Sequence, residues 1–287
     1  MKKMKSQKLT PYLLISPYLL HLGIFILFPV VFSLVLMFHR WNIISPMEFI
    51  GFQNFSKLIQ DRLFFKAIFN TLIFLIIHIP LQIILALFLA EMLNQKIRLR
   101  GLLRASYFLP VVISGVVVTI LWAQLYGFDT GLLNRILVKI GLSKVGWLIN
   151  PNLAMPSIAI MATWKNVGLY VVLFLVGLQT VPPYYYEAAD IDGATHWQKF
   201  RYITIPAINP TIFMVVIIST IGGFSLFIEP YIMTSGGPLN STVSAVLYIY
   251  KQAFTYYHMG YAAALGFFFA AIIMIFVFIQ RKVIERN

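Results

Sequence analysis

The chain has 287 residues, of which 60% are hydrophobic and only 11% are charged, and it carries a net charge of +13. A soluble domain holds roughly 25% charged residues, and a water-soluble fold of this length could not bury so much apolar surface. The composition therefore excludes a water-soluble protein and favours one whose solvent is lipid. In such a protein a positive charge is typical of Lys and Arg retained on the cytoplasmic side, so we expect no nucleic-acid partner.

The residue types that often carry chemistry are scarce. There is no cysteine, which excludes disulfides, thiolate metal sites and thiol catalysis. None of the histidines has the spacing of a metal ligand, so no metal site is predicted. The histidines are His21, His39, His78, His196 and His258.

Six apolar runs are long enough to cross a membrane, which takes roughly 20 residues. The runs cover residues 12–38, 67–89, 105–126, 156–178, 208–233 and 262–279. The first is too long for a signal peptide and is expected to be an uncleaved span. Gln124 and Lys165 interrupt the third and fourth runs, and Pro29, Pro80 and Pro110 are expected to kink or bound their helices. The sequence predicts an all-α polytopic membrane protein with six transmembrane helices in a single domain over residues 1–287.

The positions of Lys and Arg predict the orientation of these spans. One side would hold the N-terminal lysines, the loops 90–104 and 181–207, and the C-terminal tail, and fewer basic residues fall on the other side. Both termini and the loop 181–207 are therefore expected to be cytoplasmic. The basic residues that carry this argument are Lys2, Lys3, Lys5, Lys8, Lys96, Arg98, Arg100, Arg104, Lys199, Arg201, Arg281, Lys282 and Arg286.

Two segments on the opposite side, residues 46–66 and 128–150, have apolar residues at near-helical spacing among charged ones. This pattern predicts amphipathic helices at the membrane surface, which either cap the bundle or bind a partner.

The cytoplasmic loop 181–207 combines acidic residues with very small ones. Pro182 and Pro183 end the fourth span and can open a new helix. Acidic residues would then lie near the start of that helix, where its dipole favours them. The small residues permit close approach of a partner, and Gly193 also permits a break with positive φ. The acidic and small residues are Glu187, Ala188, Ala189, Asp190, Asp192, Gly193 and Ala194.

The spacing in this loop resembles the cytoplasmic signature of the permease subunits of binding-protein-dependent ABC importers. That signature reads Glu-Ala-Ala, three residues, Gly, and about nine residues before Ile-x-(Leu/Ile)-Pro. It matches Glu187-Ala188-Ala189, Gly193, Ile203, Ile205 and Pro206. The resemblance implies the type I fold of these permeases. It also implies that this loop is a coupling helix, which sits in a groove of the ATPase subunit and transmits closure of the ATPase dimer to the spans.

Other segments resemble carbohydrate permeases in particular, and together they extend the resemblance over nearly the whole chain. The nearest relatives that they imply are maltose-type oligosaccharide permeases and glycerol-phosphate permeases. Two matching segments are consecutive in the chain: Phe227-x-Glu229-Pro230-Tyr231, and then Thr234-Ser235-Gly236-Gly237-Pro238 after the fifth span. The others are Gly51-Phe52-x-Asn54-Phe55, Asn70-Thr71, and Trp164 with Gly168.

Polar groups within spans are costly and usually face the interior of the bundle. The candidate substrate path lies on the fourth and fifth spans, which the resemblance implies line the sugar pathway. Where the resemblance places asparagines that contact sugar, this chain has Ala162, Gly223 and Leu226, so the contacts lie either here or mostly in a partner permease. The candidate residues are Trp164, Lys165, Asn166, Leu169, Tyr170, Ser219, Gly223, Phe224 and Glu229.

Lys165 and Glu229 raise a specific question within this set. At about 1.5 Å per helical residue their depths in the membrane differ by roughly 9 Å, which a Lys side chain partly bridges. The two side chains either form an ion pair or reach water separately.

No phosphate-binding Gly-x-x-x-x-Gly-Lys-(Ser/Thr) motif occurs, so the chain is not expected to be an enzyme or to hold a cofactor. The resemblance implies that ATP and Mg²⁺ belong to a partner ATPase. It implies as partners a second homologous permease, two ATPase subunits, an external solute-binding protein and a sugar, assembled in the bacterial inner membrane.

The sequence therefore predicts a multi-pass subunit that imports an oligosaccharide or related polyol. Glycerol-phosphate or another small polar solute is the alternative within this class, and Lys165 would suit an anion. An ion-coupled secondary transporter is the alternative outside it. Such a transporter would need intramembrane acids or inverted repeats, and only Glu229 qualifies. A membrane-embedded enzyme would need clustered acids or histidines, which the sequence does not contain.

Overall fold

The computed structural model describes residues 2–95 and 100–284, with side chains for residues 12–95, 101–103 and 105–282. Lys96, Arg98 and Arg286, which the orientation argument uses, lie outside the described residues. The side chains of Lys2, Lys3, Lys5, Lys8, Arg100 and Arg104 also lie outside them. The chain divides into two units, Met1–Asp61 with Ile249–Ala270, and Arg62–Tyr248 with Ala271–Asn287.

The first unit begins with a long helix whose described side chains, from Tyr12 on, are mostly apolar and exposed. It comprises α1 (Lys2–Leu22), a π-helical turn (Gly23–Leu27) and α2 (Phe28–Leu36), and Tyr12–Leu36 is apolar and long enough to span a membrane. Pro29 is the second residue of α2 and directly follows the π-helical turn, so its missing N–H falls where the hydrogen-bond pattern of the helix changes. A short antiparallel pair, β1 (His39–Arg40) with β2 (Glu48–Phe49), follows it.

The expected surface helix over residues 46–66 is much shorter in the structure. Only α3 (Gln53–Ile59) forms there, because Gly51 turns the chain with a φ of +57° and the second span already begins at Arg62. The buried Asn54 side chain holds α3 to the preceding segment by donating to the carbonyls of Met37 and His39, at 2.9 and 3.0 Å. The unit is completed by a π-helical turn (Lys251–Thr255) and the first part of α15 (Met259–Ile284).

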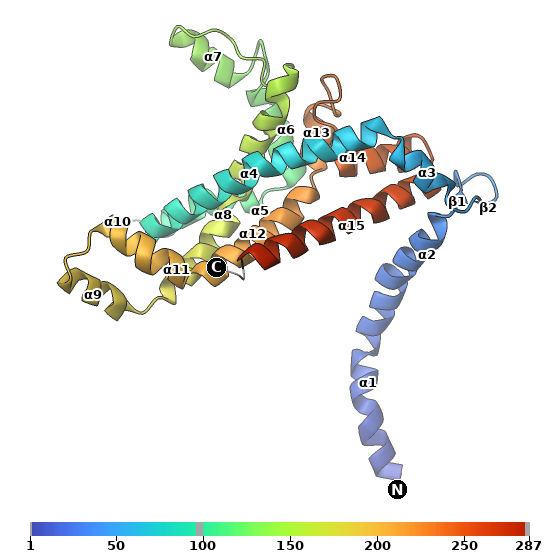
Figure 1. Ribbon diagram of the computed structural model, residues 1–287, viewed down its shortest axis with the longest axis horizontal. Helices are drawn as coiled ribbons and strands as arrows, with labels where there is room; N and C mark the ends of the chain where they lie inside the picture. Colours follow the sequence, from blue (N-terminus) through green and yellow to red (C-terminus); the bar gives the residue numbers. More distant parts are fainter. Residues whose placement is uncertain (1, 96–99, 285–287) are drawn as a thin grey trace. The chain divides into compact units, whose positions relative to one another are not determined.

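The second unit is built around three long apolar helices, α4 (Arg62–Asn94), α8 (Pro151–Gln179) and α12 (Asn209–Phe224) (Figure 1). Small residues let the backbones approach one another closely, as is usual in membrane bundles. A Cβ at Gly168 would collide with the carbonyl oxygen of Tyr107, and one at Gly177 would meet the Thr211 side chain. The other helices are α5 (Arg100–Val112), α6 (Gly115–Leu125), α7 (Leu132–Lys139), α9 (Pro183–Ile191), α10 (His196–Lys199), α11 (Ile205–Ala207), α13 (Ile228–Met233) and α14 (Ala245–Tyr250), with a π-helical turn over Phe200–Thr204.

Five helices of the described chain are long and apolar enough to cross a membrane, and a bent pair brings the number to six if it is one span. The bent pair replaces the third run: Gly101–Val112 and Gly115–Leu125 meet at 98°. The break follows Pro110 within three residues, as expected of a proline that bounds a helix. The fifth run is also interrupted, between α12 and α13, although Asn209–Met233 still qualifies as one span. Pro80, in contrast, lies inside a continuous α4.

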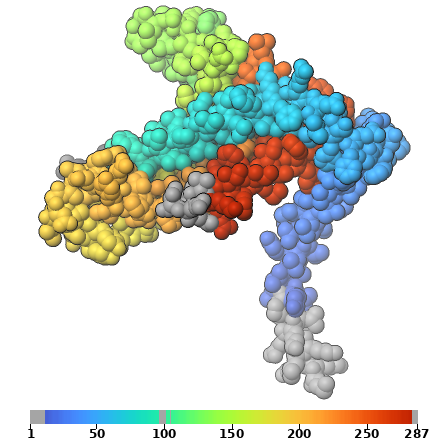
Figure 2. Space-filling model, in the orientation of Figure 1, coloured from blue at the N-terminus to red at the C-terminus, as the bar shows by residue number. Residues whose placement is uncertain are grey.

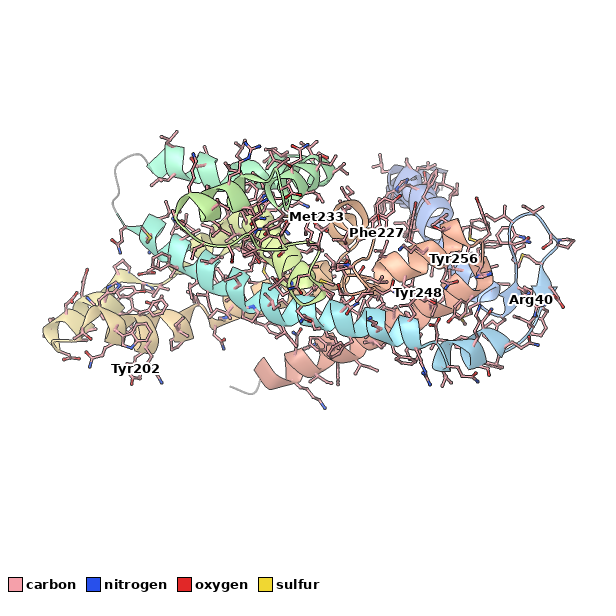
Figure 3. The ribbon with its side chains drawn as sticks, turned by 90° about the horizontal axis from the view of Figure 1, so that it is seen from above. Arg40, Tyr202, Phe227, Met233, Tyr248 and Tyr256 are labelled. Atoms are coloured by element: carbon pink, nitrogen blue, oxygen red, sulfur yellow. The ribbon has the colours of Figure 1, made fainter. Side chains whose placement is uncertain are left out.

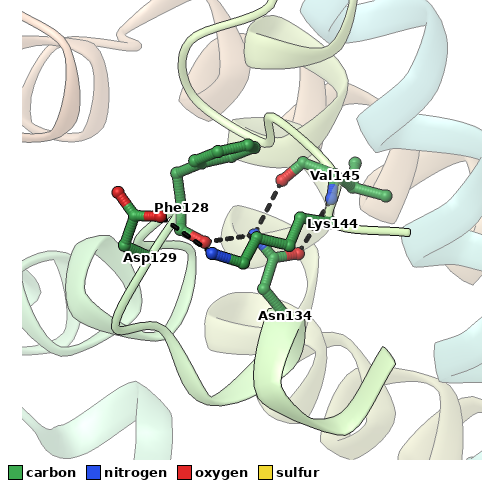
Figure 4. A network of polar contacts seen from close by, with 5 residues as sticks. All are labelled: Phe128, Asp129, Asn134, Lys144 and Val145. Atoms are coloured by element: carbon green, nitrogen blue, oxygen red, sulfur yellow. Dashed lines mark hydrogen bonds and ion pairs between the residues drawn. The ribbon is translucent and has the colours of Figure 1, made fainter. Parts of the chain in front are cut away.

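The segment 128–150 forms a small lobe in which α7 is the only helix (Figure 1). The buried Asn134 side chain organises the rest, as Figure 4 shows. Its amide group donates to the carbonyls of Phe128 and Val145, and its oxygen accepts from the Val145 N–H and the Trp147 indole, all within 3.1 Å. An exposed ion pair between Lys144 and Asp129 lies beside it at 2.8 Å. The predicted helix forms as α7, but it covers only part of the segment, and a loop held by the buried Asn134 amide forms the rest.

Candidate functional site

A polar cavity of about 260 Å³ lies among α4, α8, α12 and α13 of the second unit. Of the candidate substrate-path residues, six line it: Lys165, Asn166, Tyr170, Ser219, Gly223 and Glu229. The remaining three do not line it. Trp164 and Leu169 are half exposed, and Phe224 is buried against Phe276. Trp164 instead contacts the Trp122 ring, with a centroid separation of 5.4 Å.

Lys165 and Glu229 form an ion pair at the cavity wall, with 3.2 Å between Nζ and Oε1. Their side chains are only 15% and 11% exposed. The break after α12 makes this possible, because it places Glu229 on the separate helix α13. The depth difference expected for one straight span therefore does not keep the groups apart. The pairing left open by the sequence is confirmed.

The second span contributes residues that the sequence analysis missed. Phe74 and His78 of α4 line the cavity, and Gln82 lies one turn further along the same face, fully buried. Ser219 donates to Gln82 at 3.5 Å, and Tyr170 interacts with both. The sequence signal that could have identified them is a pair of polar residues four positions apart, at 78 and 82, in a mostly apolar helix.

His78 is fixed by a chain of two hydrogen bonds. The Thr163 hydroxyl donates to the Ala159 carbonyl at 2.8 Å and lies 2.8 Å from Nδ1 of His78. Since that hydroxyl has a single proton, Nδ1 carries its own proton and donates to Thr163. The other ring nitrogen, Nε2, is then an acceptor.

Gln82 leaves one hydrogen-bond donor without a protein partner. Its amide nitrogen, Nε2, is buried and donates to no group among the described residues. Buried polar groups are nearly always hydrogen-bonded, to protein, water or ligand. The cavity and the layer behind it therefore offer hydroxyl, amide and imidazole groups in a region of the chain that is otherwise apolar.

The residues where sugar-contacting asparagines were expected also belong to this cavity. Ala162, Gly223 and Leu226 all line it, so their small or apolar side chains determine its shape. Gly223 is required by packing, because a Cβ there would collide with Leu75 of α4.

The residues that directly follow Thr234–Pro238 are attached to the start of α4. Asn70 donates to the carbonyls of Asn240 and Val243, and Lys66 donates to that of Leu239, at 2.8–3.0 Å. The Ala245 N–H donates to the Thr71 hydroxyl at 3.0 Å. Asn70-Thr71 thus contacts the stretch that directly follows the Gly-Gly-Pro segment, about 170 residues away in the chain.

Within that segment, two threonines close the turn. The Thr234 and Thr242 hydroxyls lie 2.7 Å apart, and Thr242 also donates to the Gly237 carbonyl at 2.6 Å. Gly236 has a φ of +91°, which a residue with a side chain adopts at a cost. Figure 3 shows Phe227, Met233 and Tyr248 of this region far from Tyr202, which lies at the other end of the second unit.

The loop 181–207 forms that other end, where Figure 2 shows it as a projecting tip. Pro183 occupies the first turn of α9, as the sequence predicts. The acids were expected near the helix start, and this is wrong. Because α9 already begins at Pro183, Glu187 falls in its middle, Asp190 in its last turn and Asp192 at its C-cap. Asp190 pairs instead with Lys199, at 2.6 Å.

The Ala-to-Gly spacing of the loop has a physical cause in the end of α9. The Ala194 N–H donates to the Ala189 carbonyl at 2.9 Å, and the Gly193 N–H donates to the Asp190 carbonyl at 3.1 Å. This is the Schellman arrangement, which needs a left-handed residue just past the helix, and Gly193 has a φ of +71°. The break with positive φ that the sequence predicts at Gly193 is confirmed.

A second short helix follows immediately. Thr195 and Gln198 form a reciprocal capping box at the start of α10, with the Thr195 N–H donating to the Gln198 side chain at 2.7 Å. The two short helices leave a shallow depression of about 240 Å³ that includes Ala189, Asp192 and Ala194. Around it, Ile191, Trp197 and Tyr202 are 65–87% exposed.

The loop connects α8 and α12, two of the helices that line the cavity. It leaves α8 after Gln179 and enters α12 at Asn209. Val181 and Ile208, at its two ends, are buried in one apolar cluster with Phe174 of α8 and Ala90 of α4. A hydrogen bond of 2.9 Å between the Tyr186 and Thr204 hydroxyls joins its two halves.

A helical bundle with apolar spans, a polar cavity within the spans and a structured loop between the cavity helices defines a multi-pass membrane permease. Residues 64–287 match the family described as "Binding-protein-dependent transport system inner membrane component", and the chain belongs to this family.

The similar proteins are transport permeases. The chain is 36% identical over 286 residues to the arabinooligosaccharides transport system permease protein AraP of Bacillus subtilis, covering 96% of this chain and 89% of that one. It is 37% identical over 275 residues to the lactose transport system permease protein LacF of Rhizobium radiobacter, covering 94% and 92%. A crystal structure of a bacterial alginate ABC transporter, in complex with an alginate pentasaccharide-bound periplasmic protein, contains a chain with a TM-score of 0.83 and 27% identity, covering 100% of this chain and 97% of that one.

Proposed function

We propose that this chain is the transmembrane subunit of an ATP-driven importer for an oligosaccharide or related polyol, in a bacterial inner membrane. The observation that carries the proposal is the polar cavity inside the spans, in a chain whose relatives are named as sugar permeases. Hydroxyl, amide and imidazole groups beside the Phe74 ring suit a ligand rich in hydroxyls. The chain would form half of the path, and a second homologous permease would form the other half.

The partners follow from the same relatives. A solute-binding protein would deliver substrate on the external side, as the family name and the alginate complex suggest. Two ATPase subunits would hold ATP and Mg²⁺ and supply the free energy. This subunit would supply the path and the mechanical connection, not the hydrolysis.

The loop 181–207 is proposed as that connection. Closure of the ATPase dimer would move α9 and α10 as a tip, with Glu187, Ala188, Ala189, Asp190, Asp192, Gly193 and Ala194 at the contact. Since α8 and α12 leave opposite ends of the loop, the displacement would act on both cavity walls together. The shared apolar cluster of Val181 and Ile208 would keep the two helix ends from moving independently.

This role requires the loop and both termini to be cytoplasmic, and the chain's lack of cysteine makes the orientation easy to test. Ser143 in the lobe of α7 and His196 in the loop are both exposed. Single Ser143→Cys and His196→Cys variants should differ in intact cells, with only the first labelled by a membrane-impermeant maleimide. Labelling of His196→Cys in intact cells would contradict the orientation.

The coupling role is tested by mass spectrometry of what co-purifies with the chain from its native membranes. The native chain should bring down an ABC ATPase, and Gly193→Asp should lose it. Gly141→Asp is the matched control, because Gly141 also has a positive φ, +82°, with open space around it, but lies beside α7. Its ATPase should be retained. Failure to recover an ATPase with the native chain, or equal behaviour of the two variants, would overturn the proposal in favour of an ion-coupled carrier.

A further inference from the structure

The charges that face the substrate cavity cancel one another. Among the residues that line it, Lys165 and Glu229 are the two that carry a formal charge, and they are paired at 3.2 Å. The remaining lining groups are a hydroxyl, amide, imidazole, aromatic or aliphatic side chain, or glycine. The sequence alone suggests a cationic site, because it shows one Lys among these residues. In the folded chain the Glu229 carboxylate compensates that charge, so the cavity is not cationic.

The surroundings make this compensation matter energetically. Both side chains are largely buried, so their charges interact in a medium of lower dielectric constant than water. An anionic ligand would lose its hydration on entering and would find the ammonium group already occupied by a carboxylate. A neutral ligand with many hydroxyls pays much less and can hydrogen-bond to the polar lining.

A third element leaves space for the pair. Gly115, the first residue of α6, lies so close that a Cβ there would be 2.8 Å from Nζ of Lys165. A side chain at this position would require the ammonium group to shift.

We propose that the Lys165–Glu229 pair, for which Gly115 leaves room, is a charge filter that makes the cavity select uncharged polyhydroxy solutes over anionic ones. This inference rests on the proposed function and adds the charge class of its substrate. It decides between the neutral sugar and the glycerol-phosphate type of solute, which the sequence leaves open. The discrimination arises from compensation, so it depends on both residues together.

The experiment compares neutral and anionic versions of one sugar. The probes are lactitol with lactobionate and maltitol with maltobionate, in which the terminal unit is an open chain in both members and ends in a neutral hydroxymethyl group or a carboxylate. Binding is measured by equilibrium dialysis on the purified permease–ATPase complex in nanodiscs, without the solute-binding protein, so that its own selectivity does not contribute.

The wild-type complex should bind the neutral member of at least one pair about tenfold or more tightly than its anionic counterpart. Glu229→Gln leaves an uncompensated ammonium group and should lower this ratio by about tenfold or more. Lys165→Gln should raise it. The exchanged pair, Lys165→Glu with Glu229→Lys, keeps the compensation and should return the ratio to near the wild-type value. Gly115→Ala should shift the ratio in the direction of Glu229→Gln, because it separates the ammonium group from the carboxylate.

Equal affinity of the wild-type complex for the two members of a pair that it binds would overturn the charge filter, whatever the variants do. A ratio that stays unchanged in Glu229→Gln would overturn it as well, while leaving the sugar-import function intact. If the wild-type complex carries no oligosaccharide or polyol of a broad panel when reconstituted with its binding protein and ATP, the proposed function itself fails, and the filter fails with it. Should the single variants not assemble, the wild-type ratio still decides the matter.

Discussion

Two ion pairs lie in the regions proposed to act in transport, and the shorter of the two is the more exposed to water. Lys199–Asp190 in the loop 181–207 is the shorter, at 2.6 Å, but Asp190 is 61% exposed. Lys165–Glu229 in the cavity measures 3.2 Å, with both side chains almost buried. Water screens the first pair and leaves the second largely unscreened. The Coulomb attraction between the two charges is therefore stronger in the longer, buried pair. Burial, rather than distance, separates a surface feature from one that shapes the site.

The same contrast applies to the backbone of the two regions. The loop 181–207 is determined locally, by a proline start, a Schellman end at Gly193 and a capping box at Thr195. The cavity is assembled from α4, α8, α12 and α13, which meet only in the folded chain. Substitutions in the cavity should therefore affect the whole bundle, and those in the loop should act locally.

The largest effect is expected from removing one member of the buried pair. Lys165→Met leaves the Glu229 carboxylate without its partner, which costs about 3–5 kcal/mol for a buried pair. The thermal denaturation midpoint of the purified chain in detergent should fall sharply. The double change Lys165→Met with Glu229→Leu removes both charges and should recover most of the loss. A Lys165→Met midpoint equal to that of the native chain would contradict the pair's burial.

A smaller effect is expected where helices touch through glycine. Gly168→Ala places a methyl group against the Tyr107 carbonyl, and such overpacking typically costs about 1–3 kcal/mol. The same measurement should show a lower midpoint. Gly266→Ala in α15, where a Cβ would meet nothing within 4 Å, is the control and should be neutral or slightly stabilising.

In the loop, Thr195→Ala removes the side-chain cap of α10 and should cost about 0.5–2 kcal/mol locally. The midpoint of the whole chain should barely change. Hydrogen exchange of the amides of residues 196–199 should accelerate by about tenfold, and Thr195→Ser should restore the native rate. If the midpoint falls as much as in Gly168→Ala, the loop is not the local unit described above.

The smallest effect is expected from Lys199→Ala. A partly exposed ion pair contributes only about 0.2–1 kcal/mol, despite its short distance. Thermal denaturation should detect little or no change at moderate salt. A loss comparable with that of Lys165→Met would show that the loop pair is shielded by something other than this chain, and the comparison between the two pairs would no longer hold.

The sequence predicted the local features well, because short-range rules govern them. Apolar runs of sufficient length gave the spans, and Pro183 and Gly193 gave the start and end of α9. The extents of two helices were overestimated. Residues 46–66 and 128–150 do form α3 and α7, but a glycine turn at Gly51 precedes the first, and a loop held by the buried amide of Asn134 follows the second.

The site was predicted only in part. Six of its residues were found because polar groups in a span are conspicuous, but His78 and Gln82 on α4 were missed, as was the contact of Asn70 with the segment after the fifth span. None of these contacts follows from spacing along one helix, since each depends on which face of α4 meets α8, α12 or the distant loop.

The amino-acid sequence by itself determined that this chain lies in a membrane, how many apolar runs it has and where its loop motif stands. These follow from the cost of exposing backbone and charge to lipid and from the conformations open to proline and glycine. Only the tertiary structure decided that the charge of Lys165 is compensated by a carboxylate. The break after α12 brings Glu229 to within 3.2 Å of its ammonium group, and the balance of charge in a cavity depends on distances between separate helices.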